Sequence, residues 1–175
     1  PAMARPSLAG TPTTLALAKK VVQRHRGFLE GRGEGRGVLL NGKKAGIVGY
    51  GSIGREVGRL LQCMGMSVLA VKRSRDPGLA EEMGLEYLGA PEDLVHVMSK
   101  SDFVVVTVPL TPETRGMIGE EELRSMKPTA YLVNVARAAS VPPSTARSAL
   151  PASCIDPVIV TVGGWPYGPS MRVTN

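Results

Sequence analysis

The sequence has few of the residues that build metal centres. It holds two cysteines and two histidines among 175 residues. Cys63 and Cys154 do not match the ligand spacing of any zinc site, so we interpret both as packing thiols. The sequence therefore gives no indication of a zinc centre.

Long hydrophobic runs are also missing. The chain is 43% hydrophobic, yet its longest apolar runs, such as residues 103–106, are far shorter than a membrane span, which needs about 20 residues. The N-terminal residues lack the apolar core of a signal peptide. We therefore expect no membrane partner and a cytoplasmic location.

Aromatic residues make up only 4% of the chain, and this bears on the meaning of its net charge of +6. Nine basic residues precede Ala45, where the only acids are Glu30 and Glu34, whereas the rest of the chain carries 12 basic and 13 acidic residues. Phe28 is the single aromatic of this basic lead segment, although proteins that bind single strands stack several aromatics on bases. We expect no nucleic-acid partner, and attribute the charge to a solvated face or to attraction of anionic ligands.

Glycine, in contrast, is abundant, and one glycine run has a specific context. Residues 45–64 read AGIVGYGSIGREVGRLLQCM, an apolar strand that enters a G-x-G-x-x-G run and leaves as apolar positions at helical spacing. The run consists of Gly49, Tyr50, Gly51, Ser52, Ile53 and Gly54. In this context the pattern is typical of a dinucleotide-binding turn, the alternative being a glycine-rich loop in a non-binding α/β protein.

Each glycine of the run has an expected task. Gly49 permits the tight turn, Gly51 lets the backbone approach a pyrophosphate, and Gly54 lets the helix pack against the strand. The phosphate charge would then lie against the free N–H groups and the positive end of the helix.

Strand and helix patterns alternate along the chain. A helix is expected from a Thr13 or Thr14 cap to about Glu30, which makes His25 a helix-face residue; His96 is expected to face solvent or pack locally. Strands are predicted at 47–48, 66–71, 87–88, 103–108 and 131–135, and helices at 79–83, 91–98 and 119–126. This alternation predicts an α/β fold, a Rossmann-like doubly wound parallel sheet with helices on both faces.

Three segments together resemble the NAD(P)-binding domain of the D-isomer-specific 2-hydroxyacid dehydrogenases. They are residues 41–71 around the glycine run, residues 101–128 (SDFVVVTVPLTPETRGMIGEEELRSMKP) and residues 131–137 (YLVNVAR). Their order and spacing match the family, and the resemblance covers about residues 15–137. It implies hydride transfer between a nicotinamide and a small 2-keto or 2-hydroxy acid, and the first helix resembles the family's interdomain helix, so a homodimer is plausible.

The resemblance also implies roles for single residues. Arg137 matches the arginine that holds the substrate carboxylate, and its planar guanidinium suits a bidentate contact. Further cofactor-binding positions are implied at Val108, Pro109, Thr114, Val135 and Ala136.

Cofactor choice depends on the end of the second predicted strand. An NAD site commonly places an acid there for the ribose hydroxyls, whereas this chain has Lys72, Arg73, Ser74 and Arg75. These cations would pair with the 2′-phosphate of NADP, so we expect NADP or NAD with NADP favoured. The alternative is a solvated basic turn that selects neither.

The chain departs from the family pattern after Arg137. No histidine follows His96 and no glutamate follows Glu122, so the family's catalytic histidine and glutamate have no counterpart here, and turnover by this chain alone is not expected. We divide it into a lead segment (1–44), a dinucleotide-binding domain (45–137) and a divergent proline-rich tail (138–175).

Two interpretations fit these departures. One is a fragment or altered-reading product of a dehydrogenase, and the other is a non-catalytic dinucleotide sensor or dimerising module. The sheet would be incomplete at its C-terminal end, with the fifth strand as an apolar edge, unless residues 158–162 (VIVTV) form a sixth strand after a crossover helix at 142–150.

Overall fold

The computed structural model describes residues 10–19, 30–31, 37–74, 78–136, 140–141, 159–162 and 171–174. Its helices and strands are, in chain order, α1 (Gly10–Ala18), β1 (Lys44–Val48), α3 (Ser52–Cys63), β2 (Ser67–Val71), α4 (Leu79–Glu82), β3 (Tyr87–Gly89), the 3₁₀ turn η2 (Pro91–Asp93), α5 (Leu94–Lys100), β4 (Phe103–Val106), α6 (Glu120–Ser125), β5 (Tyr131–Asn134), β6 (Ile159–Val162) and β7 (Met171–Thr174). Within the described residues, no helix has the length and apolar character needed to cross a bilayer.

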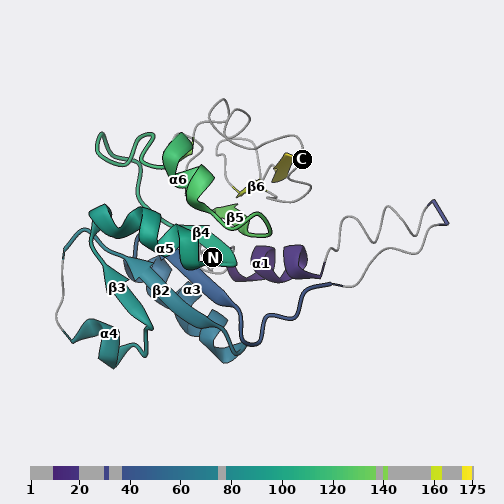
Figure 1. Cartoon of the computed structure of the whole chain (residues 1–175), viewed down its shortest axis with the longest axis horizontal. Coiled ribbons are helices and arrows are strands. Elements are labelled where there is room, and N and C mark those ends of the chain that lie inside the picture. The colour runs from purple at the N-terminus through teal and green to yellow at the C-terminus, as the bar shows by residue number, and fades with distance from the viewer. Residues whose placement is uncertain are drawn as a thin grey trace, which may run out of the picture.

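One sheet organises the domain, with the strand order β3-β2-β1-β4-β5-β6-β7 (Figure 1). Pairing is parallel from β3 through β6 and antiparallel between β6 and β7. The first strand, β1, therefore lies inside the sheet. β2 and β3 follow on one side of it, and β4 lies on its other side. This reversal next to β1 creates the switch point at which open α/β sheets bind ligands.

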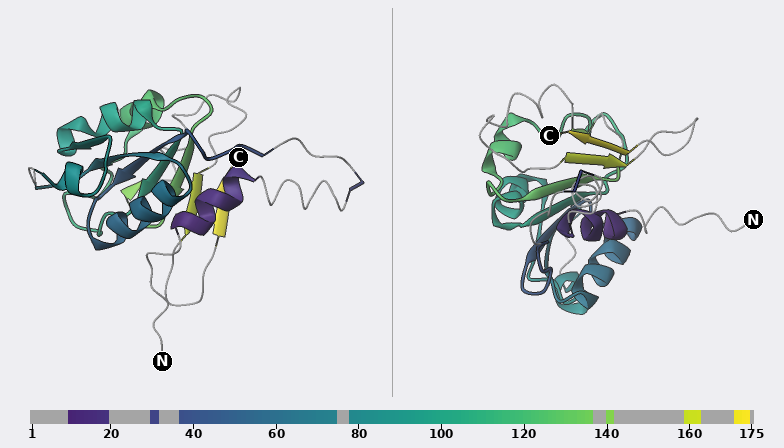
Figure 2. Two further views of the ribbon diagram at one scale, coloured as in Figure 1. Left: turned by 90° about the horizontal axis from the view of Figure 1, so that it is seen from below. Right: turned by 90° about the vertical axis from the view of Figure 1, so that its right-hand side faces the viewer.

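The strands are apolar on both faces because helices cover both (Figure 2). One face packs with α1 and α3 and carries Ala45, Ile47, Val68, Ala70, Phe103, Val105, Tyr131 and Val133. The other face packs with α5 and α6 and carries Val48, Leu69, Val71, Val104, Val106 and Leu132. Successive side chains alternate between the two cores, which accounts for the near-continuous hydrophobic runs of the central strands.

The sequence predicted most of these elements. The five expected strands and the three expected helices after the glycine run are confirmed within about two residues at each end, with two differences. β1 begins three residues earlier than the predicted strand at 47–48, and the predicted helix at 91–98 is divided into the 3₁₀ turn η2 and the α-helix α5. His96 is exposed with its ring 5.1 Å from that of Tyr87, as expected for a locally packed histidine. β6 also confirms the strand suggested at 158–162, and β5 is consequently not an edge. The crossover helix suggested at 142–150, and His25, lie outside the described residues.

The predicted start of the first helix is wrong. α1 begins at Gly10, so Thr13 and Thr14 lie inside the helix rather than at its cap, and both are buried. Pro12 falls in the first turn, where its missing N–H costs no helical hydrogen bond. α1 ends at Ala18, and the remainder of the predicted helix, residues 20–29, lies outside the described residues. Leu15 on α1 is 39% exposed.

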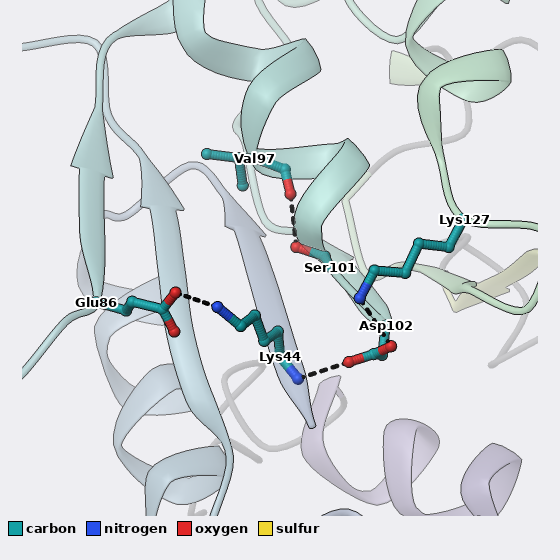
Figure 3. A network of polar contacts seen from close by, with 6 residues as sticks. All are labelled: Lys44, Glu86, Val97, Ser101, Asp102 and Lys127. Carbon is teal, nitrogen blue, oxygen red and sulfur yellow. Dashed lines mark hydrogen bonds and ion pairs between the residues drawn. The ribbon is translucent and has the colours of Figure 1, made fainter. Parts of the chain in front are cut away.

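Hydrogen bonds and ion pairs of charged side chains connect the amino-terminal ends of neighbouring strands (Figure 3). Asp102, just before β4, accepts the backbone N–H of Lys44 at 2.8 Å with one oxygen and the Lys127 ammonium at 2.9 Å with the other. The Lys44 ammonium in turn pairs with Glu86, just before β3. Ser101 closes α5 by donating to the Val97 carbonyl at 2.6 Å. The network thus ties together the starts of β1, β3, β4 and β5.

Asp102 is the centre of this network. Partial burial acts to raise its pKa, but the Lys44 N–H, the Lys127 hydrogen bond and the charges of Lys127 and Lys43 outweigh it, so the pKa lies below its ordinary value. The unfolded chain therefore binds a proton at Asp102 more readily than the folded chain. Its stabilising contribution is present above the ordinary pKa of about 3.9 and is lost as the pH falls through the lower, folded value.

We predict that Asp102→Asn lowers the free energy of unfolding at pH 7 by about 1–2 kcal/mol, because it leaves the Lys127 charge without its carboxylate. Urea unfolding at pH 7 and below pH 4 measures this, and the difference between wild type and variant should shrink as the pH falls. Glu82→Gln, which removes the same charge from the exposed end of α4, is the matched control. A difference that is constant with pH would contradict the assignment.

Candidate functional site

Two glycines of the turn after β1, Gly49 and Gly54, lie so close to neighbouring atoms that neither has room for a side chain. Gly49 has a φ of 97°, and a Cβ there would lie 2.7 Å from Val108 Cγ1 and 3.1 Å from Val108 Cα. A Cβ on Gly54 would overlap the Gly49 carbonyl oxygen. Only glycine therefore allows β1 to turn beside the end of β4 and α3 to start directly against the turn.

Hydrogen bonds join the carboxyl ends of four neighbouring strands around this turn. The Val71 carbonyl at the end of β2 accepts the N–H of Gly49 at 2.9 Å and of Tyr50 at 3.0 Å. At the end of β4, the Thr107 hydroxyl donates to the Gly49 carbonyl at 2.7 Å.

The end of β5 is held in the same way. The Val106 carbonyl accepts the N–H groups of Val135 and Ala136, both at 3.1 Å, and the buried Asn134 side chain accepts the Ala136 N–H at 3.0 Å. Sequence analysis missed Thr107 because the predicted strand ran to residue 108, whereas β4 ends at Val106; the available signal was a hydroxyl residue that interrupts the apolar run.

The start of α3 presents a positive surface. Gly51 is extended at the N-cap, and a Cβ built on it meets no atom within 4 Å, so the space beside it is open. The first turn holds no acidic residue and contains Arg55 instead. Since the first N–H groups of a helix lack intrahelical partners, this end suits an anion.

Tyr50, one of the residues predicted to bind cofactor, has its side chain in the core. It is fully buried between β1 and α3, where a Cβ on Gly58 would lie 3.2 Å from its hydroxyl. Burial raises the pKa of Tyr50, against the opposing charge of Arg55. Among the described residues the hydroxyl has no hydrogen-bond partner. The Tyr50 side chain therefore packs in the core between β1 and α3, and the expected contact of Tyr50 with a cofactor stays a prediction.

Two further groups of predicted residues lie at the same edge of the sheet. Lys72 follows β2 and is anchored by its N–H to the Gly89 carbonyl at 3.0 Å, whereas Arg73 and Ser74 beside it are exposed. Val108 and Pro109 follow β4. Arg137, the predicted substrate-binding residue, lies outside the described residues.

The loop after β4 is held by its own hydroxyl groups. The Thr114 hydroxyl donates to the Pro109 carbonyl at 2.6 Å and accepts the Thr111 N–H at 2.8 Å, so Thr114 shapes the loop. The Thr111 hydroxyl and the Glu113 backbone N–H lower the pKa of Glu113, desolvation opposes them, and the charge of Arg73 adds a smaller lowering effect. Glu113, which the sequence did not single out, is therefore ionised and within the electrostatic reach of Arg73.

The predicted residues that follow β1, β2, β4 and β5 thus lie along one edge of the sheet. They are Gly49, Gly51, Gly54, Arg73, Val108 and Val135. The described part of the chain holds no group of three His, Cys, Asp or Glu side chains arranged for a metal ion. The arrangement offers backbone N–H groups, a helix N-terminus and basic side chains, which suit a ligand carrying several phosphates.

Comparison with known proteins agrees with this geometry. The family model described as "D-isomer specific 2-hydroxyacid dehydrogenase, NAD binding domain" matches residues 12–156. A glyoxylate reductase of Thermococcus kodakarensis is 41% identical over 133 residues, which cover 70% of this chain and 39% of the relative.

Solved structures show the same likeness. A glycerate dehydrogenase related protein from Thermoplasma acidophilum superposes with a TM-score of 0.79 at 29% identity, covering 93% of this chain and 55% of that one. A D-lactate dehydrogenase from Aquifex aeolicus, solved with NAD and lactic acid, gives a TM-score of 0.73 at 27% identity, covering 82% and 43%. The chain spans 39% of the length of the Thermococcus relative.

We predict that Gly49→Ala lowers the free energy of unfolding by about 1–3 kcal/mol, because the side chain strains a positive φ and collides with Val108. Gly51→Ala, in extended backbone with open space, should change it by less than about 1 kcal/mol. Chemical denaturation of both variants measures the contrast. Equal losses would contradict the confinement described for Gly49.

Proposed function

Because the chain belongs to the D-isomer-specific 2-hydroxyacid dehydrogenase family and matches its NAD-binding domain, we propose that it binds a nicotinamide dinucleotide across the carboxyl edge of β2, β1, β4 and β5. The observation that supports this proposal most directly is the open space beside Gly51. It lies between Gly49, where the structure leaves no room for a side chain, and the N-terminus of α3. The pyrophosphate lies there, against the first N–H groups of α3. In the complete enzyme the cofactor supplies or accepts the hydride exchanged with a small 2-keto or 2-hydroxy acid.

The residues present fit such a cofactor. The loop 49–54 offers close approach because Gly51 has no Cβ in the way. We expect Val108, Pro109, Thr114, Val135 and Ala136, which follow β4 and β5, to contact the cofactor on the side of the substrate, and Arg137 to bind the substrate carboxylate.

We propose that NADP is preferred over NAD. Lys72 and Arg73 occupy the end of β2, where an acid would accept the ribose hydroxyls of NAD and repel a 2′-phosphate. Arg73 is exposed and offers a planar fork of donors to a phosphate.

Residues 1–175 by themselves would bind the cofactor without completing turnover. Reduction of a 2-keto acid needs a proton donor at the carbonyl oxygen as well as a hydride. No histidine follows His96 in the sequence, and His96 lies on α5 with its ring against Tyr87 at the start of β3. The substrate class follows from the family; which acid is used does not follow from the residues described.

We expect the chain to bind NADPH and NADH saturably, with NADPH tighter, and each to raise the melting temperature, because a ligand that binds only the folded state stabilises it. Nicotinamide fluorescence and thermal unfolding followed together measure this. Gly51→Val, which fills the open space, should abolish binding by both cofactors while the variant stays folded. A folded wild-type chain that binds neither cofactor would overturn the proposal.

We further predict that Arg73→Gln weakens NADPH about tenfold and changes NADH less than about twofold, because it removes a charge-assisted contact to the 2′-phosphate alone. Lys100→Gln, which removes an equal charge at the end of α5 next to Ser101, is the control. Competition titrations with the two cofactors give both constants. Equal weakening of NADPH and NADH would assign Arg73 a general electrostatic role instead.

A further inference from the structure

We propose that Thr107 is a positioning residue for the dinucleotide, whose hydroxyl holds the Gly49–Tyr50 peptide so that its carbonyl oxygen stays out of the phosphate space beside Gly51. The inference rests on the proposed function, since it requires a pyrophosphate in that space. It assigns a role to the side chain that directly follows β4, outside the glycine run itself.

The Gly49 carbonyl oxygen is the group that Thr107 holds. It accepts the Thr107 hydroxyl at 2.7 Å and the Gly51 N–H at 2.8 Å. At the other end of the same peptide, the Tyr50 N–H donates to the Val71 carbonyl at 3.0 Å. The peptide is therefore held through its N–H by the end of β2 and through its oxygen by the residue after β4.

This orientation keeps the oxygen away from the space proposed for the pyrophosphate. The Gly49 oxygen lies against Gly54, where a Cβ would overlap it, and no atom of Gly49 lies within 4 Å of a Cβ built on Gly51. A carbonyl oxygen carries partial negative charge and would repel a phosphate if the peptide turned it into that space, whereas backbone N–H groups attract a phosphate. Holding the peptide in place therefore favours an anion beside Gly51.

The backbone of Thr107 is fixed by the sheet, so its hydroxyl acts from a defined position. The Thr107 N–H donates to the Val48 carbonyl at 2.8 Å, next to the parallel pairing of β1 with β4. The hydroxyl lies 3.2 Å from this Val48 carbonyl and 2.7 Å from that of Gly49, so its shorter hydrogen bond goes to the turn. A turn that the fold already holds in place loses less conformational freedom when the cofactor binds.

The test compares Thr107→Val, which keeps the shape of the side chain and removes the hydroxyl, with Thr107→Ser, which keeps the hydroxyl. Thr107→Val should weaken NADPH and NADH by the same factor, about three- to tenfold, the effect of one neutral hydrogen bond. The factor is the same because both cofactors carry the pyrophosphate, in contrast to the effect expected of Arg73→Gln. Thr107→Ser should bind both within about twofold of the wild type. If Thr107→Val does not fold, Thr107→Ala makes the same comparison.

A local measurement separates this role from a general loss of stability. Without cofactor, the Gly51 N–H should exchange with solvent faster in Thr107→Val than in the wild type or Thr107→Ser, because its acceptor oxygen is less firmly held; hydrogen exchange followed by NMR measures this. Ser101→Ala is the matched control, since the buried Ser101 hydroxyl donates to the Val97 carbonyl at 2.6 Å just before the opposite end of β4. It should lower the melting temperature and change neither cofactor affinity nor the exchange of the Gly51 N–H.

The outcomes distinguish the inference from the proposed function. Wild-type affinity in Thr107→Val, a loss confined to NADPH, or a loss in Thr107→Ser as large as in Thr107→Val would overturn the inference and leave the proposed function standing. An equal loss of affinity in Ser101→Ala would assign the effect to stability and would also overturn the inference. Failure of the folded wild type to bind either cofactor would overturn both.

Discussion

The contact between Gly49 and Val108 is the constraint on which the rest of the cofactor edge depends. A Cβ on residue 49 would lie 2.7 Å from a methyl carbon of Val108, so the chain can turn beside the end of β4 only if residue 49 is glycine. That turn places the Gly49 carbonyl within reach of the Thr107 hydroxyl and starts α3 at once, with Gly54 against the turn. The absence of a side chain at Gly49 thus allows the turn, the immediate start of α3 and the open space at Gly51.

The two edges of the sheet are held by different physics. At the amino edge, Asp102 joins strands through charges and takes part in the fold itself. At the carboxyl edge, the strand ends are joined by backbone carbonyls and the Thr107 hydroxyl, which are already satisfied. Cations such as Arg73 stay exposed there. A ligand at this edge therefore meets charge that the fold does not consume, and binding need not break the contacts that hold the domain.

The elements that the sequence predicted well are those whose signal is local. The parallel strands are buried on both faces, so residues such as those of β4 form unbroken apolar runs, and the glycine spacing located the turn. What the sequence did not show depends on tertiary contact. The sequence does not show that the Tyr50 side chain fills the space beside Gly58, and β7, which reads MRVT, lacks the continuous apolar run that identifies the central strands. The early start of α1 was overlooked because threonines ordinarily favour the cap, whereas here Thr14 is buried against the sheet.

Selectivity at such a site is a difference between two binding free energies, so it depends on repulsion as much as on attraction. Cations after β2 attract every phosphate of the cofactor, and by themselves they favour NADPH only through the one phosphate that NADH lacks. An acid at the end of β2 would repel that phosphate, and this chain has Lys72 and Arg73 there instead. The residues after β2 would therefore set the ratio of the two affinities, while the glycine turn sets the affinity that both cofactors share.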